Sequence, residues 1–141
     1  MKTTKILVQK SETGLSEDNK AKLKSLKIYK DKKHFKFSNG WVDLAYELGK
    51  NIEEVCKLAN CELPKIEAMY NKYNTLRVDY HFTSPVPKIV ETLIDSLIYV
   101  TEDKSEMICE YCGKSCDIEI TEKNNHYINV CEKCFDRKKR D

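Results

Sequence analysis

Four cysteines near the C-terminal end constrain the fold of this chain more than any other feature. They form two Cys-x2-Cys pairs, Cys109/Cys112 and Cys131/Cys134, with 18 residues between the pairs. Two such pairs bring four thiolates within tetrahedral reach of one zinc ion, at Zn–S distances of about 2.3 Å. Because four thiolates leave the metal no open position for water, we expect one structural zinc ion and not a catalytic one.

Residues around these pairs support the same interpretation. Gly113 directly follows the first pair and can supply the positive φ that a tight metal-binding turn requires. The segment 117–130 is typical of a β-hairpin that separates two such turns. A disulfide or a redox Cys-x2-Cys is the weaker alternative, since two matched pairs are present. Cys116 and His126 could replace a ligand, although a thiol outside the site and a surface histidine are the simpler interpretations.

The stretches CEYCGKS (109–115) and VCEKC (130–134) resemble the zinc-binding domain of the ClpX unfoldase family. The resemblance implies a treble-clef or zinc-ribbon module that is held by the four paired cysteines. Domains of that family dimerise and dock adaptor proteins, so the resemblance also implies protein docking and a possible homodimer. It is confined to the cysteine segment, and no ATPase segment follows it.

A second pattern lies in the middle of the chain, at VCKLANCELPKI (55–66). Cys56 is a small residue in the first helix, and Asn60, four residues later, can adopt the left-handed turn conformation. Cys61, the next residue, and Ile66, five residues further on, are apolar and would pack the second helix against the core. The segment resembles a helix-turn-helix or winged-helix motif, with Asn60 in place of the more usual glycine. The alternative is a small helical core with no role in nucleic-acid binding.

The predicted fold class is α+β, with an N-terminal β-hairpin, a small winged-helix-like helical core and a C-terminal zinc ribbon or treble-clef module. The expected domains are an α+β domain over 1–101, a polar hinge at 102–106 and the zinc module at 107–141. Apolar periodicity predicts the remaining elements. They are strands at 4–9 and 76–82, a hairpin at 26–37 in which apolar and basic residues alternate, and helices at 41–50, 51–60, 63–74 and 84–101. The first of these helices is expected to end near Gly49, and the helix at 63–74 would be the recognition helix of the helix-turn-helix motif.

Charge is unevenly distributed, although the net charge is only +2. Residues 1–40 hold eleven lysines and four acidic residues, whereas residues 41–103 hold six basic and eleven acidic residues. Because proteins bind a nucleic-acid backbone mainly through Lys and Arg, we expect phosphate contacts from two basic clusters. Their members are Lys27, Lys30, Lys32, Lys33, Lys36, Arg137, Lys138, Lys139 and Arg140. A solvated face, or compensation of the zinc-thiolate charge, are the simpler alternatives.

These patterns predict a non-enzymatic, zinc-binding regulatory protein that binds nucleic acid or a nucleoprotein complex. The alternative is an inhibitor or adaptor of the phage or mobile-element kind, for example anti-CRISPR-like, that docks on a host protein through its acidic helices and zinc module. Catalysis is not expected, because the chain has no Gly-rich phosphate loop, no nucleophile elbow and only scattered histidines. No apolar run is long enough to span a membrane, so we expect a cytoplasmic location.

Overall fold

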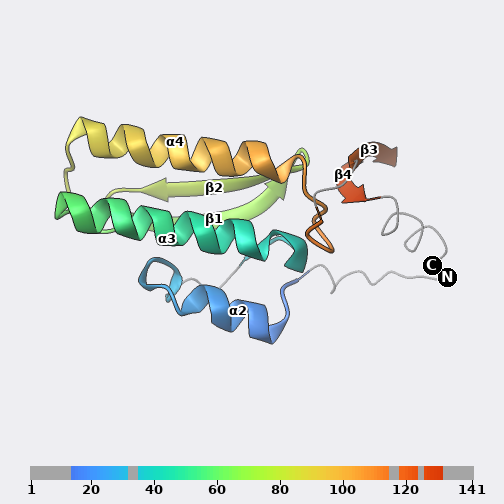
Figure 1. Ribbon diagram of the computed structural model, residues 1–141, viewed down its shortest axis with the longest axis horizontal. Coiled ribbons are helices and arrows are strands. Elements are labelled where there is room, and N and C mark those ends of the chain that lie inside the picture. Colours follow the sequence, from blue (N-terminus) through green and yellow to red (C-terminus); the bar gives the residue numbers. More distant parts are fainter. Residues whose placement is uncertain (1–13, 32–34, 115–117, 124–125, 132–141) are drawn as a thin grey trace.

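The computed structural model describes residues 14–31, 35–114, 118–123 and 126–131, the last two ranges as backbone only. Helices and two separate two-stranded antiparallel sheets, β1–β2 and β3–β4, make up this part of the chain, which confirms the predicted α+β class. Helices α3 and α4 lie side by side against the sheet formed by β1 and β2, and α2 packs beside α3 (Figure 1). In chain order the elements are α2 (Glu17–Lys24), η1 (Lys27–Tyr29), η2 (Asn39–Trp41), α3 (Val42–Ala59), β1 (Lys65–Lys72), β2 (Thr75–His81), α4 (Lys88–Ser105), β3 (Ile118–Lys123) and β4 (His126–Cys131).

Helix α3 is a single helix of 18 residues, so the prediction of two helices that break at Gly49 is wrong. Gly49 is buried inside the helix, where its missing side chain allows the η1 segment to approach. A Cβ there would lie 2.6 Å from a Tyr29 ring carbon and 2.8 Å from Leu26 Cδ1. Close packing, and not chain termination, therefore explains this glycine. The helix ends at Asn60, which adopts the left-handed conformation with φ 59°.

The segment 63–74 is largely strand β1, so the prediction of a recognition helix there is wrong. A β-bulge between Ile66 and Ala68 lets Ile66 and Met69, three residues apart, both be buried. The same spacing is typical of a helix, which explains the error. Strand β2 confirms the prediction for 76–82. The described residues therefore do not form a helix-turn-helix or winged-helix arrangement, because a strand follows α3.

Residues 26–37 were predicted to form a hairpin, but their described part contains the short 3₁₀ helix η1 and a single bridge to β1. Lys36 makes that bridge, donating to the Met69 carbonyl at 2.9 Å and accepting from the Asn71 amide at 3.2 Å. Phe35 and Phe37 are buried on either side of exposed Lys36. Apolar and basic residues therefore alternate between inside and outside at 35–37, but adjacent Ile28 and Tyr29 are both buried in η1, so the prediction of a hairpin is wrong.

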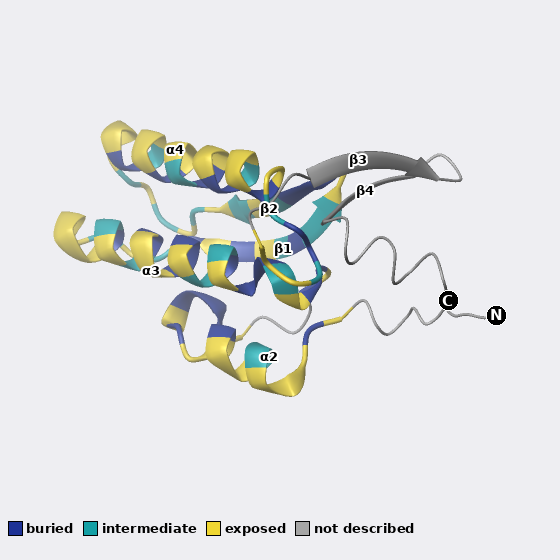
Figure 2. Ribbon diagram, turned by 45° about the vertical axis from the view of Figure 1, so that its right-hand side comes forward, coloured by how far each residue is buried: buried dark blue, intermediate teal, exposed yellow. Residues whose placement is uncertain are grey.

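Helix α4 confirms the helix predicted at 84–101 and continues through Ser105, so most of the expected hinge at 102–106 is helical. The side of α4 that faces the sheet is buried and the opposite side is exposed (Figure 2). None of the helices in the described ranges has the length and apolar composition needed to cross a lipid bilayer.

The core lies between the helices and the β1–β2 sheet and is built from aliphatic and aromatic side chains. Trp41, Tyr29 and Phe37 are its largest fully buried members. Helix α2, which the sequence analysis missed, covers this core with Leu23. Ser16 caps α2 by accepting a hydrogen bond from the Asn19 amide at 3.2 Å.

Strands β3 and β4 confirm the hairpin predicted at 117–130. The predicted strand at 4–9 lies outside the described residues. Several predicted site residues also lie outside them, namely Lys32, Lys33, Cys134, Arg137, Lys138, Lys139 and Arg140, as does Cys116.

Candidate functional site

The first cysteine pair lies in a tight turn, residues 109–114, which we call the first knuckle. Gly113 donates to the Cys109 carbonyl at 2.9 Å, and Cys109 donates to the Lys114 carbonyl at 3.1 Å. Gly113 has φ +80°, which confirms the positive φ predicted for it. Cys109 is buried and Cys112 is exposed. The chain therefore reverses between the two cysteines, as a zinc-binding turn requires.

The second pair is described only in part. Cys131 is the last residue of β4 and pairs in register with Ile118. His126 begins the same strand and lies five positions before Cys131, so roughly 16 Å of extended backbone separates the two residues. This distance argues against His126 as a replacement ligand. Within the described residues no three candidate metal ligands come together, and Cys134 and the Cys131 side chain lie outside them.

The first knuckle packs directly on the helical domain. Gly40 donates to the Glu110 carbonyl at 2.7 Å, and Trp41 Nε1 donates to the Ile108 carbonyl at 3.0 Å. A Cβ on Gly40 would lie 2.3 Å from the Cys109 carbonyl oxygen. Only glycine allows such a close approach of two backbones. The knuckle is therefore seated against the turn that begins α3.

Glu110 fixes this contact with a buried carboxylate that the sequence analysis missed. Its side chain lies between the two cysteines in sequence and is only 6% exposed. The Ser38 amide donates to Oε2 at 3.2 Å, and Asn71 Nδ2 donates to Oε1 at 2.6 Å. These two donors belong to segments far apart in sequence. No local pattern around Glu110 could have indicated them.

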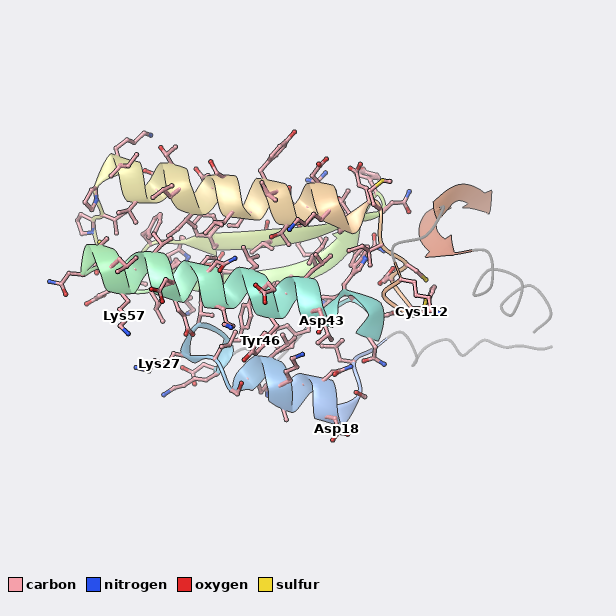
Figure 3. All side chains as sticks on the ribbon, viewed as in Figure 1. Asp18, Lys27, Asp43, Tyr46, Lys57 and Cys112 are labelled. Carbon is pink, nitrogen blue, oxygen red and sulfur yellow. The ribbon has the colours of Figure 1, made fainter. Side chains whose placement is uncertain are left out.

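Of the predicted nucleic-acid contacts, the structure describes only Lys27, Lys30 and Lys36. Lys27 and Lys30 are exposed around η1, and Lys36 is exposed beside β1 (Figure 3 labels Lys27). The predicted recognition helix is a strand, so the described residues present no helix for a DNA groove in that position.

A groove of about 470 Å³ runs between α3 and α4 on the side away from the sheet. Its apolar lining comes from both helices and comprises Leu44, Leu48, Val55, Leu93, Leu97 and Val100. Leu93 and Val100 are 46% and 47% exposed, which is high for large apolar residues that flank a core. The sequence analysis missed this groove, because its two walls come from helices whose pairing only the fold determines.

Acidic residues line one edge of this groove, and the first knuckle lies at one end of it. Asp43 and Glu47 of α3 and Lys104 of α4 contribute its charged lining. Ile108 and Gly113 close one end, and Figure 3 shows Asp43 and Cys112 at that same end of the molecule. Lys22 lies 3.0 Å from Asp43, so part of the acidic charge is compensated. The groove is thus an apolar trough with a mainly acidic edge and a cysteine turn at one end.

No family model, curated protein or solved structure matches the chain.

Proposed function

We propose that this chain is a non-enzymatic, zinc-binding regulatory protein that docks on a protein partner through the groove between α3 and α4. The observation that carries the proposal is an exposed apolar groove, bounded by acidic residues, that ends at the first knuckle. Metal binding at the knuckle would hold Ile108 and Gly113 in place at the end of the groove. Such a surface suits an inhibitor or adaptor of the phage or mobile-element kind that docks on a host protein.

The zinc part of the proposal is supported by the turn at residues 109–114 and by the spacing of the cysteines. Cys109, Cys112, Cys131 and Cys134 would hold one structural zinc ion. The test is elemental analysis of protein that was purified without chelator. We expect one zinc per chain, lost in Cys112→Ser and retained in Cys61→Ser, a cysteine of the helical domain. Absence of stoichiometric metal from the wild-type chain would overturn this part of the proposal.

The choice of a protein partner is supported by the charge of the helical layer. Helices α3 and α4 together hold eight acidic and four basic residues. Such a surface repels the phosphate backbone of a nucleic acid but can bind apolar and basic side chains of a protein. The test compares wild type with Val100→Glu in pull-downs from nuclease-treated lysate. We expect one stoichiometric protein with the wild type and its loss with the variant.

Nucleic-acid binding is the second candidate, because Lys27, Lys30 and Lys36 are all exposed. If this candidate holds, affinity for DNA or RNA falls steeply as salt rises, and Lys27→Glu/Lys30→Glu weakens binding while the fold is kept. If the double variant and the wild type bind equally weakly at all salt concentrations, the basic residues are a solvated face.

A further inference from the structure

We infer that the groove between α3 and α4 binds one amphipathic α-helix of a partner protein, with an apolar face and with lysine or arginine along one flank. This inference rests on the proposed docking function and specifies the shape and charge of the partner segment. It follows from the geometry of the groove, from the chemistry of its walls and from the charge along α3.

The geometry favours a helix. Helices α3 and α4 have 18 residues each, which corresponds to walls of about 27 Å. Apolar exposure continues towards the end of the groove remote from the knuckle, where Leu58 is 77% and Ile89 is 64% exposed. The groove lining itself runs from Asp43 to Val55 on α3 and from Leu93 to Lys104 on α4, about 17 Å of each helix. A trough of this length accepts the apolar stripe of about three turns of a third helix, with anchors at i, i+3 or i+4, and i+7.

The walls argue against an extended peptide. A peptide in β conformation gains its affinity from main-chain hydrogen bonds to an exposed sheet edge. Here both walls are helices, whose backbone amides and carbonyls bond within each helix except near the ends. The groove offers apolar side chains such as Leu93 and Val100 instead, and these match the side chains of a packing helix.

The charge along α3 specifies the flank of the partner. Asp43, Glu47 and Glu54 are exposed at positions i, i+4 and i+11 of α3, and Lys50 is exposed at i+7. This line along the helix, which we call the acidic edge, therefore carries three acidic residues and one lysine. Lys22 pairs with Asp43, whereas no cation pairs with Glu47 among the described residues. Lysine or arginine on the partner would complement this edge. A second copy of this chain would instead bring another acidic edge.

The test is a selection from a phage-displayed library of helical peptides of about 16 residues, roughly four turns each, against the immobilised full chain. The expected result is enrichment of sequences with apolar residues at helical spacing and basic residues on one flank. An enriched peptide, synthesised with a fluorophore, then gives affinities by anisotropy for the wild type and four variants.

The variants separate the groove from its surroundings. Val100→Glu places a charge in the apolar wall and is expected to weaken peptide binding at least tenfold. Tyr99→Glu is the matched control on the same helix, 69% exposed and outside the groove lining, and is expected to bind like the wild type. Glu47→Lys is expected to weaken binding several-fold through the acidic edge, whereas Asp18→Lys, on α2, is not.

Three results would overturn the inference: no enrichment, enrichment of acidic or non-helical peptides, or equal losses in Val100→Glu and Tyr99→Glu. A dimer in sedimentation that disappears in Val100→Glu would also overturn it, since the occupant would then be a second copy. The two proposals can fail separately. If Val100→Glu abolishes the stoichiometric pull-down partner but no basic helix is selected, docking stands and the helical partner does not.

Discussion

Two segments of this protein each combine two nearby cysteines with an adjacent residue in the left-handed conformation, yet the two segments have different roles. At the end of α3, Cys61 donates to the Cys56 carbonyl at 2.9 Å, next to Asn60 with φ 59°. In the first knuckle, Gly113 donates to the Cys109 carbonyl at the same distance, with φ +80°. Both segments share a hydrogen-bonded turn with one residue at positive φ, so this backbone conformation cannot by itself indicate a metal site.

The surroundings of the sulfur atoms distinguish the two segments. Cys56 is 1% exposed and belongs to the apolar core, where burial raises the pKa of its thiol and keeps it protonated. Cys112 is exposed at the surface of a turn that continues toward the β3–β4 hairpin. A pair of nearby cysteines is therefore informative only together with the fold that directs its side chains.

The largest loss of stability is expected from Gly40→Ala, which tests whether the protein depends on close packing of the first knuckle against Gly40. The added Cβ would lie 2.3 Å from the Cys109 carbonyl oxygen and 2.4 Å from that of Glu110. Both obstructing groups are backbone, so the knuckle must move. We expect a loss of about 3 kcal/mol or more in the free energy of unfolding, measured by urea denaturation. Gly14→Ala, at an exposed position, is the control, and equal stability of both variants would contradict the close seat.

A somewhat smaller effect is expected from Glu110→Ala, which removes the buried carboxylate between the two cysteines. The Ser38 amide and the Asn71 side chain would lose their acceptor, and hydrogen bonds to a charged group contribute about 1.5–3 kcal/mol each. We expect thermal and urea unfolding to show a loss of about 3 kcal/mol. Glu110→Gln keeps one acceptor and should lose about half as much. A variant as stable as the wild type would show that the contact is dispensable.

The cysteine pair of α3 provides the next comparison. Cys56→Ser places a hydroxyl in the core and is expected to destabilise the fold by about 1–3 kcal/mol. Cys61 is only half buried, so Cys61→Ser should change stability by less than about 0.5 kcal/mol. Neither substitution should change the zinc content. Loss of metal in either variant would mean that the two segments are not chemically separate.

The smallest effect is expected in the part of the pH dependence of stability that Cys56 causes. Because the pKa of its thiol is raised in the folded state, the stability that this thiol contributes is fully present below the pKa of the unfolded chain. It is lost as pH rises from that value through the folded pKa. Above the ordinary pKa of a free cysteine, about 8.5, the stability of the wild type should therefore fall more steeply with rising pH than that of Cys56→Ala. Parallel curves for the two proteins would assign the alkaline loss to other groups.

Predictions from the sequence are confirmed where a residue's role depends on its neighbours along the chain. The hairpin at 117–130, the strand at 76–82, the helix at 84–101 and the positive φ of Gly113 were all predicted. Predictions are wrong where strand register or a contact between distant residues determines the local structure. The bulge at Ile66 gave a strand the apolar spacing of a helix, and Gly49 looked like a helix stop because its close contact with Tyr29 is not a local property.

The sequence by itself determined the α+β class, the acidic character of the helical layer and the cysteine spacing, because each depends on local composition and period. Only the tertiary structure decided that the first knuckle is seated on Gly40 and Glu110, and that α3 and α4 leave an apolar groove between them. Both features join residues far apart in the chain. Their physical cause is close packing and the burial of polar groups, which depend on the three-dimensional neighbours that the fold supplies.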